Sequence, residues 1–111
     1  MQNQRSPRIA FYRNNVEDLL VVGGGYGLRE QRSELGKIEL TQPEQEELMS
    51  VDTIVIDYLG MATTEEIWPG LLIDDPSADI KDWWWHLGAL HHRSYPADRL
   101  SEGLRETYLN P

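Results

Sequence analysis

The residues best suited to chemistry gather in one segment, where the chain's 3 histidines follow an aspartate. Asp82 and His86 are one helical turn apart, so on a helix they would share a face and could supply two metal ligands or an acid–base pair. A regular helix would point His91 and His92 in other directions. We therefore predict no metal site and no catalytic residues. A small metal-dependent enzyme that uses Asp82 and His86 is kept as an alternative.

The glycine-rich stretch at residues 19–27 resembles the strand-to-glycine turn of dinucleotide-binding flavoenzymes. That fingerprint requires glycines spaced G-x-G-x-x-G, but counting from Gly23 and Gly25 places Leu28 where the last glycine should be. A phosphate-binding loop, an H-E-x-x-H zinc helix and a nucleophile elbow are also missing from the sequence. We therefore predict that the chain is not an enzyme, that it has no cofactor, and that residues 23–27 form a loop.

Three consecutive tryptophans, Trp83, Trp84 and Trp85, are the most unusual feature of the sequence. Successive residues of a helix are about 100° apart, so the three rings cannot all face one core. Trp84 falls on the face expected to be buried, which leaves Trp85 as the candidate exposed ring. An exposed tryptophan beside charged residues is typical of a protein-binding hot spot, although it can equally cover a neighbouring loop or a second subunit.

Acidic residues surround these rings. Between residues 65 and 82 the chain carries six carboxylates and only one basic residue, Lys81. An acidic rim around aromatic anchors would steer a basic protein on approach and bury apolar area at the centre of the contact. The predicted partner-binding surface consists of Glu65, Glu66, Trp68, Asp74, Asp75, Asp79, Asp82 and Trp85.

Overall charge narrows the class of partner. The chain has 10 Lys and Arg against 19 Asp and Glu, a formal net charge of −9. This charge opposes binding to nucleic acid and favours a basic protein, although it also promotes solubility. The sequence has no signal peptide and no stretch of the roughly 20 apolar residues that cross a membrane. Because cysteine is absent as well, we expect a cytoplasmic protein that binds neither nucleic acid nor a membrane.

Strands are predicted mainly in the first half of the chain. Apolar runs at residues 9–12 and 19–22 suggest a hairpin that turns at Asn14 and Asn15. The β-branched run at residues 52–58 predicts the central strand of a sheet. Further strands are expected over the two short runs at residues 37–40 and 71–73.

Helices are predicted from capping signals. Thr41 followed by Pro43 and Glu44 predicts a helix over residues 43–49, and Asp79 is expected to cap a helix that ends near His91. A last amphipathic helix is expected over residues 97–109, with Ala97, Leu100, Leu104 and Tyr108 along one side. The chain of 111 residues is therefore predicted to be a single α+β domain over residues 1–111. Its small sheet of about 3–5 mostly antiparallel strands would be packed by C-terminal helices.

The segment from Asp82 to Leu87 and the following residues 91–96 (HHRSYP) resemble a stretch of bacterial toxin-immunity proteins, especially those of contact-dependent growth inhibition systems. Small size, acidity and lack of cysteine add to the resemblance. It implies a cytoplasmic inhibitor that binds a cognate toxin domain, often a nuclease, and neutralises it by blocking its active site. A homo-oligomeric structural or accessory protein, with the tryptophans buried against another copy, is the alternative.

Overall fold

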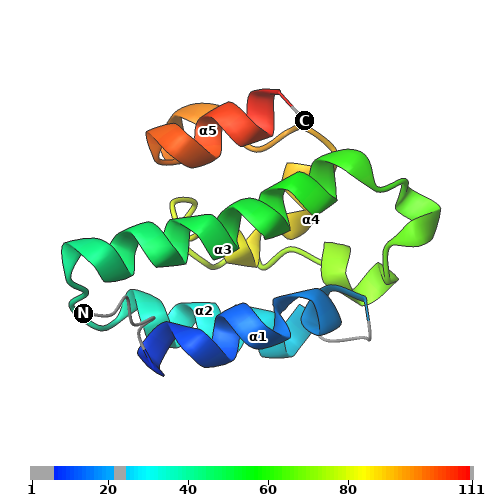
Figure 1. Cartoon of the computed structure of the whole chain (residues 1–111). Coiled ribbons are helices and arrows are strands. Elements are labelled where there is room, and N and C mark those ends of the chain that lie inside the picture. The colour runs from blue at the N-terminus through cyan, green and yellow to red at the C-terminus, as the bar shows by residue number, and fades with distance from the viewer. Residues whose placement is uncertain (1–6, 22–24, 111) are drawn as a thin grey trace.

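The computed structural model describes residues 7–21 and 25–110 of the chain. The long helix α3 (Gln42–Met61) runs through the centre, with α1 (Pro7–Val21) and α2 (Gly25–Gly36) on one side and α5 (Glu102–Leu109) on the other (Figure 1). Shorter elements complete the described fold: the 3-10 helices η1 (Thr64–Glu66), η2 (Pro69–Leu72), η3 (Trp83–Trp85) and η4 (Ala97–Arg99), and helix α4 (Leu87–His91). Direct packing joins α1 to both α2 and α3, and joins α3 to α5 and α4.

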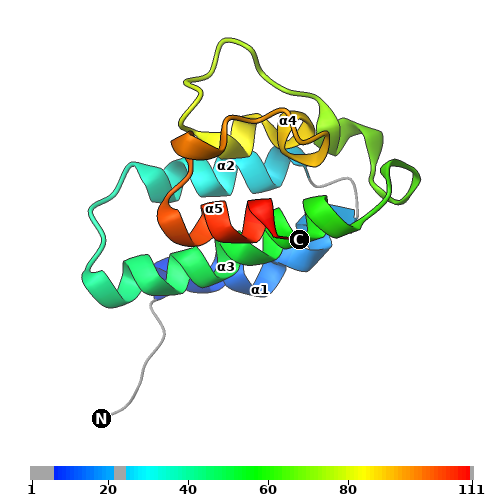
Figure 2. The ribbon, with the colours of Figure 1, turned by 90° about the horizontal axis from the view of Figure 1, so that it is seen from above.

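The connection between η2 and η3, residues 73–82, arches away from the helices (Figure 2). A hydrogen bond closes the loop onto η3, in which the Asp75 backbone N–H donates to the Trp85 carbonyl at 2.9 Å. Beyond this loop the chain returns to the helices, and η3 packs against α2. The loop therefore delivers the tryptophans to a helix that lies about 50 residues earlier in the sequence.

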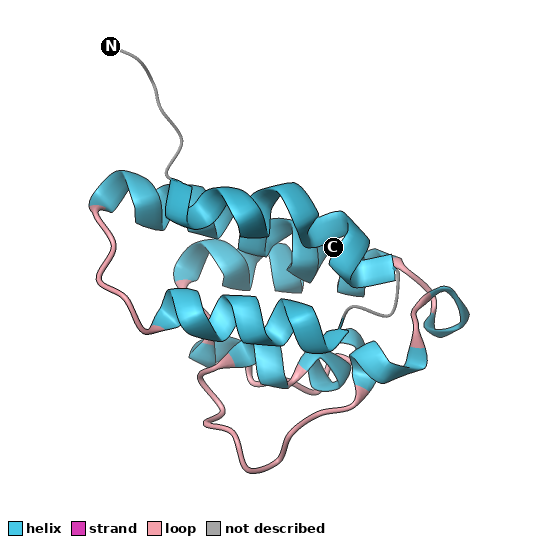
Figure 3. Ribbon diagram, turned by 90° about the horizontal axis from the view of Figure 1, so that it is seen from below, coloured by secondary structure: helices cyan, strands magenta, loops and turns pink. Residues whose placement is uncertain are grey.

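The predicted α+β fold is wrong, because the described residues contain helices and no strand (Figure 3). The run predicted as the central strand lies inside α3. The buried residues of α3 in and around this run are at positions 48, 51, 52, 55, 56 and 59. This spacing places them on one face of the helix. Helical packing on several neighbours therefore overrides the strand preference of its β-branched residues.

The predicted hairpin is wrong for the same reason. Ile9, Tyr12, Val16 and Leu20 are the buried positions of α1, spaced three or four residues apart. The expected turn at Asn14 and Asn15 is therefore in the middle of this helix. Val22, the last residue of the second predicted strand, lies outside the described residues.

The remaining strand and loop predictions are also corrected. Residues 37–40 form a connection, and Leu71 and Leu72 belong to η2. The predicted glycine loop is helical from Gly25 onward as the start of α2, whereas Gly23 and Gly24 lie outside the described part of the chain.

The helix predictions were partly correct. The capping box is confirmed, since the Glu44 N–H donates to Thr41 Oγ1 at 3.3 Å and the Thr41 N–H donates to Glu44 Oε1 at 2.9 Å. The helix it starts continues to Met61, well past residue 49. The helix expected from Asp79 to His91 is wrong: that stretch contains a turn, η3 and only the short α4. The last predicted helix is split into η4 and α5, with Leu100, Leu104 and Tyr108 buried as expected.

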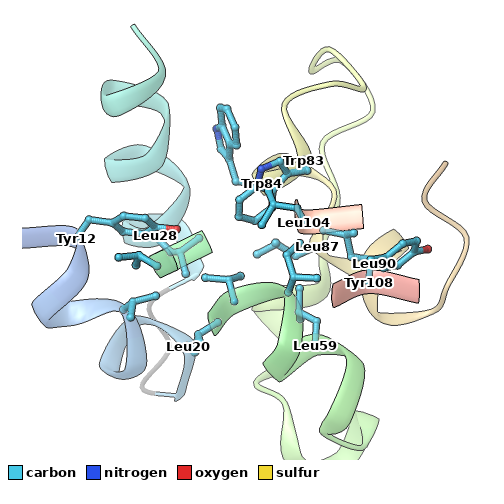
Figure 4. Packing of buried hydrophobic residues seen from close by; sticks show 14 of the residues in the cluster. Tyr12, Leu20, Leu28, Leu59, Trp83, Trp84, Leu87, Leu90, Leu104 and Tyr108 are labelled. Atoms are coloured by element: carbon cyan, nitrogen blue, oxygen red, sulfur yellow. The ribbon is translucent and has the colours of Figure 1, made fainter. Parts of the chain in front are cut away.

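One hydrophobic core connects the described helices (Figure 4). Members shown there come from every main helix and from η3: Tyr12, Leu20, Leu28, Leu59, Trp83, Trp84, Leu87, Leu90, Leu104 and Tyr108. Fully burying one such side chain contributes about 1.5–3 kcal/mol, so this cluster makes the main favourable contribution to folding. In the described ranges, no helix combines the length and apolarity that a membrane span requires.

Candidate functional site

A groove between α2 and η3 brings together Asp82 and Trp85, two of the residues predicted to bind a partner. Its volume is about 510 Å³. Helix α2 and the connection that follows it contribute Glu30, Ser33, Glu34, Gly36 and Lys37, and the chain around η3 contributes Asp82, Trp84 and Trp85. We call this site the tryptophan groove.

Ser33 fixes both indole rings of the tryptophan groove. The indole N–H of Trp84 donates to Ser33 Oγ at 2.8 Å, and that of Trp85 donates to the same oxygen at 3.1 Å. Trp83 packs edge to face on Trp84 with ring centroids 5.6 Å apart. Trp83 and Trp84 are buried and Trp85 is half-buried, so Trp85 is the most exposed ring of the three but is partly covered by α2. Two indole rings are therefore held in position at the groove before any partner arrives.

Arg32 supports the rings of Trp83 and Trp84 from behind. Its guanidinium lies 4.3 Å from the centroid of Trp84 and binds the Asp52 carboxylate through contacts of 2.9–3.1 Å. The Tyr12 hydroxyl donates to the same carboxylate at 2.9 Å. Burial raises the pKa of Asp52, while Arg32 and Tyr12 act in the opposite direction by stabilising the carboxylate. This buried cluster connects α1, α2 and α3 beneath the groove.

Arg29 attaches the chain on either side of the arching loop to α2. Its side chain donates to the carbonyls of Leu71 and Ile73 at 2.7 Å each and to the Trp84 carbonyl at 3.2 Å. Burial lowers the pKa of Arg29, and the nearby carboxylates of Asp74 and Asp75 oppose that shift. Satisfying three backbone oxygens with one guanidinium fixes the path of the loop relative to α2.

The charge at the tryptophan groove is mainly negative. Glu30, Glu34 and Asp82 supply three carboxylates, and Lys37 supplies one ammonium, which hydrogen-bonds Glu34 at 3.1 Å on the exposed surface. Asp82 precedes η3 without using its carboxylate as a helix cap. A guanidinium or ammonium group entering here would meet both carboxylates and the half-buried indole ring of Trp85, the two kinds of group that attract such cations in proteins.

Other predicted acids serve the fold. Asp74 accepts hydrogen bonds from the backbone N–H groups of Gly88 at 2.7 Å and Ala89 at 3.0 Å, at the start of α4. Asp75 accepts from the Ser77 hydroxyl and backbone, and these hydrogen bonds lower its pKa. Asp79 accepts from the backbone N–H of Lys81 at 3.0 Å. These three residues organise the arching loop and the helix that follows it.

The rest of the predicted surface lies elsewhere. Glu65 and Glu66 are exposed in η1, beyond the C-terminal end of α3, and Glu66 accepts from the Thr63 N–H at 2.8 Å. Trp68 is 43% exposed, and its ring lies over Gly70, where an added Cβ would come within 2.2 Å of it. The tryptophan groove thus combines only Asp82 and Trp85 of the eight predicted residues.

The histidines are used in packing and hydrogen bonding. His86 is buried, with Nε2 lying 3.2 Å from the Asp79 carbonyl oxygen. His91 connects the Leu59 carbonyl to the Thr64 hydroxyl, at 2.8 Å on each side of its ring. Across residues 7–21 and 25–110, the structure places no three His, Asp or Glu side chains where they could hold a metal ion.

Sequence reasoning missed the residues that build the groove from α2. Ser33 and its indole partners are more than 50 residues apart in sequence, and no local pattern connects them. The burial of Asp52 could have been predicted, since this charged residue lies at a helical spacing among apolar neighbours. Such a residue is usually buried with a charged or hydrogen-bonding partner.

Comparisons with known proteins give no relative: no family model matches the chain, and no curated protein or solved structure shows significant similarity to it. What the tryptophan groove can bind therefore follows from its own rings, carboxylates and supporting contacts.

Proposed function

We propose that the chain is an acidic binding protein of the inhibitor or immunity type, which neutralises a basic protein partner by covering its active site. The observation that carries this proposal is the tryptophan groove, where three carboxylates stand beside two prearranged indole rings. A toxin domain such as a nuclease is a fitting partner, because the basic surface that binds phosphates would be attracted to a chain of net charge −9.

A lysine or arginine of the partner would enter the groove as its central contact. The indole face of the half-buried Trp85 would attract the cation by about 0.5–2 kcal/mol, depending on how much water is excluded. Glu30 and Asp82 would accept its hydrogen bonds, and such charge-assisted bonds are about twice as strong as neutral ones. Because Ser33 already holds the rings, little side-chain entropy would be lost at this point on binding.

The experiment begins with capture of the partner from native host cells on the tagged chain at low and high salt. The partner is then purified, and its affinity is measured by calorimetry against wild type and the double variant Glu30→Lys/Asp82→Lys. We expect a loss of at least about tenfold, because two attractive carboxylates become repulsive cations. Added salt should weaken the wild-type complex more than the variant complex.

A matched control separates the groove from general charge. Glu39→Lys/Glu106→Lys reverses two exposed acids that lie outside the groove, so it changes net charge by the same amount. Circular dichroism confirms that both variants are folded. Equal affinity of the two double variants for the partner would refute the tryptophan groove as the binding site.

A further inference from the structure

A second groove runs between α1 and α3 rather than between α2 and η3. Its volume is about 610 Å³, and its lining is formed by Glu17, Asp18 and Leu20 from α1 and Ile54, Asp57, Tyr58 and Met61 from α3. We call this site the α1–α3 groove. None of its residues lines the tryptophan groove, so the two sites can be altered independently.

The centre of the α1–α3 groove is apolar. Leu20 is buried, while Ile54 is 39% exposed and Met61 is 69% exposed. Asp57, Tyr58 and Met61 follow Ile54 by three, four and seven residues, so the four share one face of α3. Methionine is flexible and polarisable, and it is frequent on protein surfaces that adapt to the side chains of a partner.

The exposed strip of α3 continues beyond the groove, but its lining becomes polar. Ile54 also lines a neighbouring hollow of about 560 Å³ that reaches Pro43 and Glu46 near the start of the helix. At about 1.5 Å per residue, Glu46 and Met61 are about 22 Å apart along the helix axis, the length of about four helical turns. Only the end from Ile54 to Met61 is apolar, a length of about 10 Å or two helical turns. The apolar part therefore accepts about two turns of a partner helix, and the rest of the strip would meet its polar side chains.

Charge along this strip is also negative. Glu17, Asp18 and Asp57 are exposed beside the apolar residues, and Glu46 is exposed near the other end. Arg13 is a cation in the neighbouring hollow, and it forms an ion pair with Glu47. An apolar groove with an acidic border complements a helix that carries leucine-like residues on one face and Lys or Arg on both sides of it.

We infer that the α1–α3 groove docks an amphipathic basic helix of the partner. This inference rests on the proposed function, because it supplies a second contact with the same basic protein. A second copy of the chain fits less well. Placing two such faces together would oppose the carboxylates of Glu17, Asp18 and Asp57 from both copies, and apposed like charges cost binding free energy.

The test uses synthetic peptides with the intact chain. One peptide of about 18 residues has Leu at helical spacing and Lys on its other faces, and its match has Glu in place of Lys. Fluorescence anisotropy measures affinity, and amide NMR shifts locate the site on isotope-labelled protein. We expect binding of the Lys peptide only, with shifts concentrated at residues 17–20 and 54–61.

Variants then assign the binding site. Asp18→Lys/Asp57→Lys should lower the affinity for the Lys peptide by at least about tenfold. Met61→Ser should lower it severalfold without loss of folding, because the Met61 side chain is exposed. Glu39→Lys/Glu106→Lys and Glu30→Lys/Asp82→Lys should each change its affinity less than about twofold, since these residues lie outside the α1–α3 groove.

Three outcomes would overturn the inference: no binding of the Lys peptide, loss of binding only in Glu30→Lys/Asp82→Lys, or a sedimenting dimer that Met61→Ser abolishes. Affinities of the two double variants for the captured partner distinguish failure of this inference from failure of the proposed function. If only Glu30→Lys/Asp82→Lys weakens binding of the partner, the docking inference is wrong and the tryptophan groove remains the proposed site. If only Asp18→Lys/Asp57→Lys weakens binding of the partner, the tryptophan groove is not the binding site and the docking inference stands.

Discussion

The two grooves expose acidic and apolar groups in comparable hollows, but they are built differently. The tryptophan groove rests on buried polar contacts, in which Ser33, Arg32 and Asp52 hold the rings and helices together. The α1–α3 groove is lined mainly by exposed side chains of two helices that already pack on each other. The first is prearranged for one cationic group, whereas the second can adapt to a longer segment. Substitutions of the residues that support the tryptophan groove should therefore lower the stability of the fold, whereas substitutions in the lining of the α1–α3 groove should mainly lower affinity for the partner.

The largest expected difference compares two aspartates of α3. Asp52→Ala removes the partner of Arg32 and Tyr12 and leaves a largely buried guanidinium unpaired, which should lower the free energy of unfolding by about 3 kcal/mol. Asp57→Ala, five residues along on the α1–α3 groove, should change it by less than about 0.5 kcal/mol because Asp57 is exposed. Urea unfolding measures both. Equal values would show that the two grooves are supported alike.

A second comparison tests the packing behind η3. An added Cβ at Gly88 would lie 2.3 Å from the Leu72 carbonyl oxygen and 2.9 Å from Asp74 Oδ1, so Gly88→Ala should displace the Asp74 cap and cost about 2 kcal/mol. At Gly36, beside the tryptophan groove, the nearest atom would be 3.5 Å away on Trp84. Gly36→Ala should therefore be nearly neutral. Thermal unfolding that ranks Gly36→Ala as the more harmful change would contradict this packing.

Ser33→Ala isolates the hydroxyl that positions the rings. Removing it leaves the indole N–H groups of Trp84 and Trp85 without their acceptor, which should cost about 1–2 kcal/mol. Met61→Ser, the exposed change at the other groove, should cost less than about 0.5 kcal/mol. Tryptophan fluorescence should also shift in Ser33→Ala and stay unchanged in Met61→Ser. If Ser33→Ala changed neither the free energy of unfolding nor the fluorescence, the positions of the rings would not depend on this hydroxyl.

A smaller effect is expected from alkaline pH, and it should not distinguish the grooves. Burial raises the pKa of Tyr95 from 10.0 to about 12, and burial also raises the pKa of Tyr12. A raised tyrosine pKa means that the folded chain holds the proton more firmly than the unfolded chain. The stability that this shift contributes is fully present below about pH 10 and is lost as pH rises toward about 12. For Tyr95 the loss is about 1 kcal/mol after allowance for solvent screening.

Tyr95→Phe tests this pH dependence. The variant lacks the titrating hydroxyl that donates to the Ile80 carbonyl, so its stability should fall less steeply between about pH 10 and pH 12. Urea unfolding at several alkaline pH values, with an absorbance titration of the tyrosines, provides the measurement. Identical slopes for wild type and variant would exclude Tyr95 as a source of the alkaline loss.

Local signals in the sequence were sufficient where the structure is decided locally. Thr41 and Glu44 satisfy each other's backbone N–H groups within a single turn, so the start of α3 could be predicted from these residues alone. The burial of Leu104 and Tyr108 likewise follows from their spacing on one short helix. The apolar runs of α1 and α3 were ambiguous, because β-branched residues fit a strand as well as a helix packed on several neighbours.

Long-range contacts explain what could not be predicted. The start of α4 depends on Asp74, which lies 14 residues before Gly88, rather than on Asp79. The tryptophan groove depends on Ser33, Glu30 and Glu34 of α2, which no pattern near the tryptophans indicates. Asp82 and Trp85, which line this groove, could be proposed as binding residues because a dense acidic stretch beside consecutive aromatic residues is visible in the sequence itself.

The most direct test of the central claim is an inhibition assay with the captured partner. The activity of the partner is titrated with wild type, with Glu30→Lys/Asp82→Lys and with the control Glu39→Lys/Glu106→Lys. We predict that wild type and control abolish the activity at similar concentrations, whereas the groove variant needs at least about tenfold more protein. Full inhibition by the groove variant at the wild-type concentration would contradict the account.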